Sequence, residues 1–223
     1  DGFLNDIRGR HLTKQHVKDA IEAATAGPVQ EGAVGAGAGT VAFGWKGGIG
    51  TSSRKLPDGL GGWTVGVLVQ SNFGGVLTID GKRIGQALGQ YFLKDSLDKD
   101  ISADGSIMIV VATDAPLSDR NLSRLAKRAL SGLARTGASM TNGSGDYIIA
   151  FTNNADTRRS DSDDRRSVTD LSNVSMSPLF QAVAEATEES IYNSLFMARN
   201  VKGHHGEIKA LPMDEVKALL KSE

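Results

Sequence analysis

The sequence predicts a layered α/β sandwich, in which helices cover the faces of a β-sheet. Two apolar runs rich in Ile and Val and bounded by turn residues, at 107–111 and 147–151, predict strands in the second half of the chain. Each run is followed by a segment with apolar residues at helical spacing. Most of the 27 glycines fall before residue 90, which favours strands and tight loops there. Parallel and antiparallel pairing stay undecided at this level.

The strand predicted within residues 104–114 organises the rest of the chain. Five consecutive apolar residues follow Ser106, and such a run is typical of a strand buried on both faces. Gly105 precedes Ser106 and is free to adopt backbone angles that other residues avoid. A self-cleaving hydrolase would hold its nucleophile at such a strand start. The alternative interpretation is that Gly105 and Ser106 are only the turn leading into a core strand.

The first half reads as one helix followed by short strands. Apolar residues after the N-cap candidate Thr13 predict an amphipathic helix over about 13–25, which Gly27 and Pro28 end. The segments after it predict, in order, a glycine-rich loop, a strand, a turn, a second strand and a third strand, at 32–39, 40–45, 47–54, 63–72 and 76–79. Residues 84–104 are polar and are expected to form a surface excursion.

In the second half, the spacing of Leu and Ala residues predicts a helix over about 119–135 with one buried face. Residues 153–173 carry charges of both signs and are expected to form a solvated loop. Ser177 and Pro178 open a long helix that ends near residue 199, and a short helix is expected over about 213–221.

Composition bounds the function only broadly. The 223 residues suffice for one domain with a substantial core. A net charge of -1, with 23% charged residues, argues against a dedicated nucleic-acid or membrane-surface binder, and no apolar run is long enough to span a membrane. The absence of cysteine excludes disulfides, thiolate metal sites and a cysteine nucleophile. Such a chain suits a cytoplasmic location and is also compatible with the periplasm.

Several motifs with a possible chemical meaning are better explained without it. The glycine string at 35–39 follows a helix and opens a strand, which is the reverse of a dinucleotide-binding fingerprint. The four histidines lack zinc-ligand spacing, and no Gly-x-Ser-x-Gly elbow is present for a Ser-His-Asp triad. The Arg- and Asp-rich segment at 158–166 has nearly balanced charges and no aromatic residues, so it is interpreted as a solvated loop.

Two polar turns remain as candidates. In the segment 142–146, Ser144 and Asp146 lie two residues apart and glycines flank the serine. Asn72 ends the predicted strand 63–72 and could offer its amide to a developing oxyanion. Each feature also has an ordinary explanation as a turn between elements.

Taken together, these segments resemble the DmpA/BapA-type β-aminopeptidases, also called L-aminopeptidase/D-esterase enzymes, a branch of the self-processing N-terminal-nucleophile-like hydrolases. The resemblance is carried, in chain order, by residues 4–7, 31–45, 69–74, 105–117, 142–151 and 175–180. Family precursors carry a considerable further segment ahead of the position of Asp1, which helps to build the sheet and the substrate pocket. The first residues here have neither an initiator Met nor a signal-peptide pattern, so the start is expected to be an internal point of a longer product.

The resemblance implies a four-layer αββα sandwich with mixed sheets covered by helices, and a precursor that cleaves itself between Gly105 and Ser106. Residues 1–105 would form the α-subunit part and residues 106–223 the β-subunit part of a single domain. Ser106 would be the nucleophile, and Ser144 would hydrogen-bond to it as a proton relay. Asp146 would be the acidic member, where the family often has Glu, and Asn72 would help to form the oxyanion hole.

The function implied is an autoprocessing serine aminopeptidase that releases N-terminal β-amino, D-Ala or L-amino acids from short peptides, amides and esters. It would need no metal or organic cofactor. Its partners would be the small peptide or amide substrate, its own cleaved fragment, and further copies in an oligomer of processed heterodimers, with no nucleic acid or membrane. Two alternatives stay open: an acyltransferase of the ornithine acetyltransferase type, whose processing sites typically present Thr, and a non-catalytic binding protein on the same fold.

Overall fold

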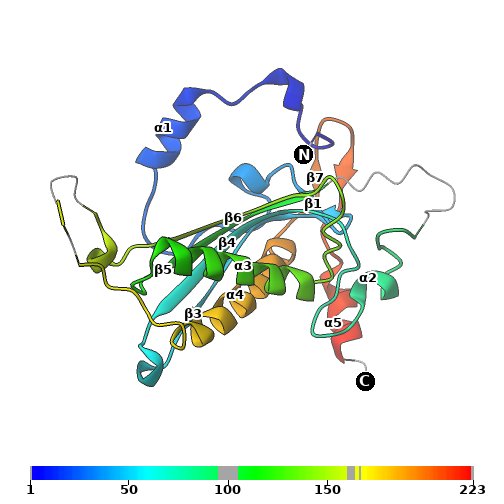
Figure 1. Ribbon diagram of the computed structural model, residues 1–223. Helices are drawn as coiled ribbons and strands as arrows, with labels where there is room; N and C mark the ends of the chain where they lie inside the picture. Colours follow the sequence, from blue (N-terminus) through cyan, green and yellow to red (C-terminus); the bar gives the residue numbers. More distant parts are fainter. Residues whose placement is uncertain (1, 95–104, 160–163, 166, 222–223) are drawn as a thin grey trace.

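A four-stranded mixed sheet forms the centre of the computed structural model (Figure 1). Its strands are β3 (Gly48–Lys55), β4 (Thr64–Asn72), β5 (Ser106–Thr113) and β6 (Gly145–Thr152), in this spatial order. The pairs β3–β4 and β4–β5 are antiparallel, and β5–β6 is parallel. The sheet therefore mixes both kinds of pairing, which the sequence had left undecided. The structure describes residues 2–94, 105–159, 164–165 and 167–221.

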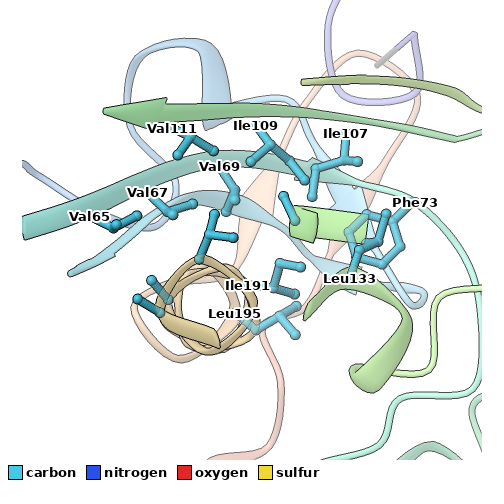
Figure 2. Packing of buried hydrophobic residues seen from close by; sticks show 14 of the residues in the cluster. Val65, Val67, Val69, Phe73, Ile107, Ile109, Val111, Leu133, Ile191 and Leu195 are labelled. Atoms are coloured by element: carbon cyan, nitrogen blue, oxygen red, sulfur yellow. The ribbon is translucent and has the colours of Figure 1, made fainter. Parts of the chain in front are cut away.

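Two helices, α3 (Asp119–Arg135) and α4 (Met176–Phe196), cover one face of this sheet (Figure 1). Every second residue of β4 and β5 points into the core against them, because side chains alternate along a strand. Figure 2 shows this packing, with the β-branched residues of the two strands above Ile191 and Leu195 of α4. The fully or almost fully buried members on the two strands are Val65, Val67, Val69, Ile107, Ile109 and Val111.

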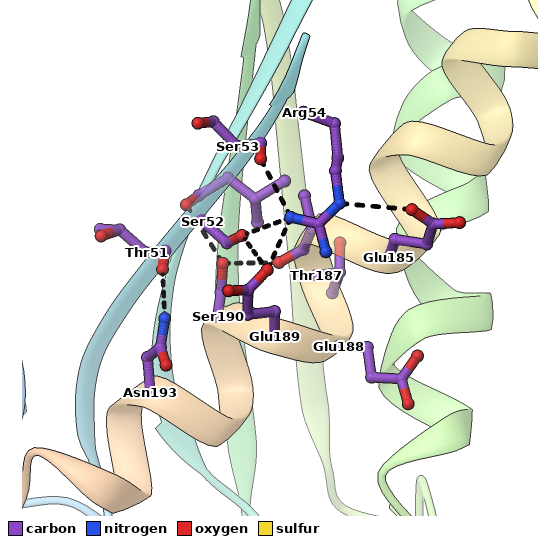
Figure 3. A network of polar contacts seen from close by, with 12 residues as sticks. Thr51, Ser52, Ser53, Arg54, Glu185, Thr187, Glu188, Glu189, Ser190 and Asn193 are labelled. Carbon is purple, nitrogen blue, oxygen red and sulfur yellow. Dashed lines mark hydrogen bonds and ion pairs between the residues drawn. The ribbon is translucent and has the colours of Figure 1, made fainter. Parts of the chain in front are cut away.

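Polar contacts add to this packing between α4 and the edge strand β3 (Figure 3). The Arg54 guanidinium donates from Nη1 to Glu189 Oε2 at 2.6 Å and from Nε to Glu185 Oε2 at 3.3 Å. Ser52 Oγ donates to the same Glu189 oxygen at 2.7 Å. The hydrogen bond from Ser52, together with the charge and hydrogen bond of Arg54, lowers the pKa of Glu189 although partial burial opposes this. These contacts set the position of α4 along β3.

The opposite face of the sheet is open in the described residues. Met108, Tyr147, Ile149 and Phe151 are 36–64% exposed on that face. The prediction that β5 is buried on both faces is therefore wrong: Met108 of β5 is exposed on this side, because the helices cover only the other face. The described residues supply one sheet layer and one helix layer of the expected four-layer sandwich.

The first half differs from the sequence prediction in its strands. The stretch predicted as one strand over 40–45 is a tight hairpin, β1 (Val41–Ala42) and β2 (Trp45–Lys46). Its turn residues Phe43 and Gly44 have φ values of 54° and 85°, which a continuous strand cannot accommodate. The stretch predicted as a turn over 47–54 is most of β3 instead. Its glycines fit a strand because other backbone segments pack closely against it: a Cβ on Gly50 would collide with the backbone of α4, and a Cβ on Gly48 with the backbone of Gly32.

The remaining elements agree with the predictions only in part. The amphipathic helix α1 (Lys14–Glu22) has Thr13 as its N-cap and buries none of its residues, and it lies on the side of the sheet away from α3 and α4 (Figure 1). The prediction of a strand over 76–79 is wrong, because these residues hydrogen-bond to the turn that follows α3, through Val76 N to Gly137 O at 2.9 Å. Part of the predicted excursion is helix α2 (Ile84–Ala87), and residues 95–104 lie outside the described residues. The minor elements are η1 (Ile7–Gly9), η2 (Gly35–Gly37), η3 (Asp58–Leu60), η4 (Ala155–Thr157), β7 (Val201–Lys202), β8 (Glu207–Ile208) and α5 (Met213–Lys221).

Among the described helices, none is both long and apolar enough to cross a membrane.

Candidate active site

Three of the central strands bring candidate residues into one row at the end of the sheet. Asn72 pairs with Ser106 across β4 and β5, and Ser106 pairs with Gly145 across β5 and β6. Paired residues on neighbouring strands share a face. Because Ser71 and Ile107 face the helices, this row lies on the open face of the sheet. The side chain at the centre of the row is the half-buried Ser106.

The Ser106 hydroxyl lies against the carbonyl group of the preceding residue. Its Oγ donates to Gly105 O at 2.7 Å. The backbone N–H of Gly145 donates to Ser106 Oγ at 3.3 Å and to Gly105 O at 3.3 Å. The nucleophile candidate, the carbonyl it would attack and a backbone donor on that carbonyl are thus in contact in the uncut chain. This is the set of groups that an acyl transfer needs at its reacting centre.

Gly105 itself is held in a crowded position. A Cβ on this residue would lie 2.9 Å from Phe73 Cα and 3.1 Å from Asn72 O. Both neighbours are backbone atoms, which cannot move aside as a flexible side chain could. Close backbone approach is therefore the reason that glycine fits before Ser106, rather than an unusual backbone angle.

The Asn72 amide has a defined orientation. Its Oδ1 accepts a hydrogen bond from Val41 N at 2.9 Å. A backbone N–H can only donate, so the oxygen must face Val41 and the NH2 group must point elsewhere. Within the described residues, this NH2 group makes no hydrogen bond. An amide held in this way can donate to an oxyanion that forms near Ser106.

Ser144 and Asp146 form the second polar pair of the site. Ser144 Oγ donates to Asp146 Oδ1 at 2.8 Å. Asp146 is the strand partner of Ile107, whose side chain faces the helices. Ser144 and Asp146 both line a small hollow on this side, together with Leu133. The shorter Asp side chain therefore does reach Ser144.

The expected hydrogen bond between Ser144 and Ser106 is not formed in the described structure. The Ser106 hydroxyl is instead bonded to Gly105 and Gly145 of the backbone. A hydroxyl has a single proton to donate, and in Ser106 this proton is used in the hydrogen bond to Gly105 O. The structure thus places Ser106, Asn72 and Gly105 together, and it places Ser144 and Asp146 at the adjoining end of β6.

Two groups at the site escaped the sequence analysis. The first is the backbone N–H of Gly145, whose only sequence signal was its place between Ser144 and Asp146. The second is Lys46, which is fully buried and lies within the β1–β2 hairpin, whose Val41 N–H bonds to Asn72. In the sequence, its burial is indicated only by the apolar and glycine residues around a single lysine. A lysine in such a setting more often reaches solvent through its long side chain.

The histidines lie outside this arrangement. His11 Nε2 is 3.7 Å from Asp6 Oδ2, and His16 Nδ1 accepts from Thr13 N at 3.0 Å at the start of α1. The rings of His204 and His205 lie against each other at a tilt of 59° in the β7–β8 region. In the described part of the chain, no histidine hydrogen-bonds to Ser106 or Ser144.

Comparison with known proteins identifies the family and the fold of this chain. A family model described as Peptidase family S58 matches residues 1–209. A "Beta-peptidyl aminopeptidase BapA" from Sphingosinicella microcystinivorans is 41% identical over 233 residues, covering 99% of this chain and 59% of the relative. A Burkholderia sp. β-aminopeptidase structure has a TM-score of 0.87 at 38% identity, covering 99% of this chain and 62% of the other.

The L-aminopeptidase D-Ala-esterase/amidase of Ochrobactrum anthropi, described as a variant of the Ntn hydrolase fold, also has a TM-score of 0.87, at 33% identity, covering 99% of this chain and 60% of the other. The chain thus spans about three fifths of the length of these relatives. These matches confirm the resemblance and the fold class inferred from the sequence. The chain belongs to peptidase family S58.

Proposed function

We propose that this chain is the catalytic part of an autoprocessing serine aminopeptidase, with Ser106 as the nucleophile. The observation that carries the proposal is the row formed by Asn72, Ser106 and Gly145, with the Ser106 hydroxyl 2.7 Å from the carbonyl oxygen of Gly105. The Ser106 hydroxyl and the Gly145 N–H both contact the Gly105 carbonyl group, and the Asn72 amide belongs to the strand residue paired with Ser106. Acyl transfer requires these three components, a nucleophile and two donors for the oxyanion.

The first reaction would be self-cleavage. Ser106 Oγ attacks the Gly105 carbonyl carbon, the C–N bond to Ser106 breaks, and the hydroxyl proton passes to the departing amine. The resulting ester between Gly105 and Ser106 Oγ is hydrolysed by water, which gives a carboxylate on Gly105 and a new N-terminus on Ser106. The Gly145 N–H at 3.3 Å from Gly105 O would stabilise the oxyanion of this step.

Cleavage would also complete the site for external substrates. The new α-amine has a reference pKa of about 7.7–8.0, so a useful fraction is neutral near pH 7 and can act as the base for its own hydroxyl. Departure of the Gly105 carbonyl frees that hydroxyl to bond with Ser144. Ser144 would then relay a proton with Asp146 behind it, and Asn72 would donate to the oxyanion of the substrate.

The substrate class follows from the family. The relative from Sphingosinicella is named a β-peptidyl aminopeptidase, and the Ochrobactrum structure an L-aminopeptidase D-Ala-esterase/amidase. We therefore expect release of an N-terminal β-amino, D-Ala or L-amino acid from short peptides, amides and esters, without a metal or organic cofactor.

Mass spectrometry and one kinetic assay test this proposal. Under denaturing conditions, the wild-type chain should give two fragments divided before Ser106, and Ser106→Ala should stay intact. Ser53→Ala, which changes an exposed serine on β3, is the matched control and should be processed normally. The processed protein should hydrolyse β-alanyl or D-alanyl p-nitroanilide. Transfer of the acyl group to an added amine as the main reaction would support an acyltransferase instead, and an intact but active chain would remove self-cleavage from the mechanism.

We further propose that the two fragments stay together and that the open face receives another layer. Strands β4 and β5 would belong to different fragments, yet they are hydrogen-bonded along their whole length. The apolar side chains on the open face would be buried by a second sheet, as the four-layer expectation requires, and the longer relatives have polypeptide that could supply it. Native mass spectrometry should show the two fragments as one complex and, if the expected oligomer forms, multiples of that complex.

A further inference from the structure

Lys46 is a buried cation on the oxyanion side of the site. Its side chain is 0% exposed, whereas lysine is almost never fully buried without a partner. Its Nζ donates to three backbone carbonyl oxygens: Gly37 at 2.7 Å, Thr40 at 2.8 Å and Gly47 at 2.7 Å. These three acceptors use all three N–H groups of an ammonium, while a neutral amine has only two. Burial lowers the pKa of Lys46 to about 8, so the side chain is charged at neutral pH.

One of these carbonyls belongs to the peptide unit that holds Asn72. The C=O of Thr40 and the N–H of Val41 are the two ends of a single planar peptide group. Lys46 binds the oxygen of that group, and Asn72 Oδ1 accepts from its N–H at 2.9 Å. Lys46 is also the strand partner of Val41 across the β1–β2 hairpin. A continuous hydrogen-bonded chain therefore runs from the ammonium to the Asn72 amide.

The hydrogen bonds that run from the Lys46 ammonium to Asn72 Oδ1 make the Asn72 NH2 group a better donor. The positively charged Lys46 ammonium that donates to Thr40 O polarises the peptide group and makes the Val41 N–H a stronger donor. A stronger bond to Asn72 Oδ1 in turn polarises the side-chain amide, so its NH2 carries more positive charge. Within the described residues, no carboxylate contacts Lys46, so its charge is balanced by peptide dipoles alone.

We propose that Lys46 is a positioning residue for the oxyanion donor: it orients and polarises the Thr40–Val41 peptide, which holds the Asn72 amide with its NH2 group toward the carbonyl that Ser106 attacks. This inference rests on the proposed function, in which Asn72 donates to the oxyanion. Lys46 itself touches neither the substrate nor Ser106.

Hydrogen exchange of the Val41 N–H tests the structural link without using activity. In Lys46→Met, which keeps the length but removes the charge, this N–H should exchange at least about 10-fold faster, because its acceptor is no longer held. The amide of Ile109 in the middle of β5 should exchange as in wild type, which separates a local change from general unfolding. Lys55→Met, an exposed lysine on β3, is the matched control. Unchanged exchange at Val41 overturns the proposal. If Lys46→Met does not fold, Lys46→Gln, which keeps two N–H donors, takes its place.

A double-mutant cycle on turnover tests the catalytic consequence. With β-alanyl p-nitroanilide, Lys46→Met should lower kcat by about 10-fold with little change in KM, since only transition-state stabilisation is lost. In an Asn72→Ala background, the same substitution should have almost no further effect, because the group it positions is gone. If Lys46→Met lowers kcat by the same factor in the Asn72→Ala background as in wild type, Lys46 acts independently of Asn72 and the proposal is wrong. If Ser106→Ala hydrolyses the substrate as wild type does, the proposed function fails and the catalytic role of Lys46 with it, while the exchange experiment still reports whether Lys46 holds Val41.

Discussion

Gly105→Ala is the most direct test of the geometry before the nucleophile. The added Cβ would lie 2.9 Å from Phe73 Cα and 3.1 Å from Asn72 O. Carbon atoms in favourable contact are about 3.5 Å or more apart, so the backbone at residue 105 must move away by roughly 0.5 Å. Overpacking of this kind costs about 1–3 kcal/mol, and the lower entropy of an unfolded chain with Ala offsets about 0.4–1 kcal/mol of it. We expect a net loss of about 1–2 kcal/mol in the free energy of unfolding.

The same displacement should slow self-cleavage. A misplacement of about 1 Å can reduce the rate of a positioned reaction about 100-fold, so a shift of half that size should slow it by on the order of 10-fold. The assay is the fraction of intact chain against time after synthesis, measured by denaturing mass spectrometry, together with chemical denaturation. Gly59→Ala is the control, because its Cβ would meet no heavy atom within 4 Å. Wild-type cleavage and wild-type stability in Gly105→Ala would refute the view that contact with β4 sets the position of Gly105.

Three further predictions concern the scaffold. Ile109→Ala, at a fully buried position, should lower the free energy of unfolding by about 2–5 kcal/mol. Ile149 is 56% exposed, so Ile149→Ala should lower it by less than about 1 kcal/mol in this chain. Equal losses in urea titrations would mean that the open face is covered in solution. The pKa of Lys46 is about 8 in the folded chain and near 10.5 in the unfolded chain, so the unfolded chain binds more protons between these pH values. The free energy of unfolding of wild type, relative to Lys46→Met, should therefore rise there by up to about 1.4 kcal/mol per pH unit. A constant difference at pH 8, 9 and 10 would contradict this. Arg54→Met should cost no more than about 1 kcal/mol, because the pair with Glu189 is partly exposed, and the loss should shrink in 1 M salt; a loss that is independent of salt would point to packing instead.

The sequence predicted the elements whose signals are local. The helix over 119–135 and the helix over 213–221 were placed at their observed bounds, because apolar periodicity and end signals lie within each segment. The strands containing residues 107–111 and 147–151 were recognised for the same reason. Local signals failed over 40–54, where Gly50, which read as a turn residue, is needed for the close approach of α4, a segment more than 120 positions away.

For the candidate site, the sequence and its resemblance to the family predicted which side chains would do the chemistry: Ser106, Ser144, Asp146 and Asn72. It could not decide how they lie, since register between strands is set by pairing and packing across distant segments. Only the tertiary structure placed Asn72, Ser106 and Gly145 in one row, and only it brought Lys46 onto the peptide group that holds Asn72. Residue types limit what a site can do, whereas the distances between groups remote in sequence follow from how the sheet and the helices pack.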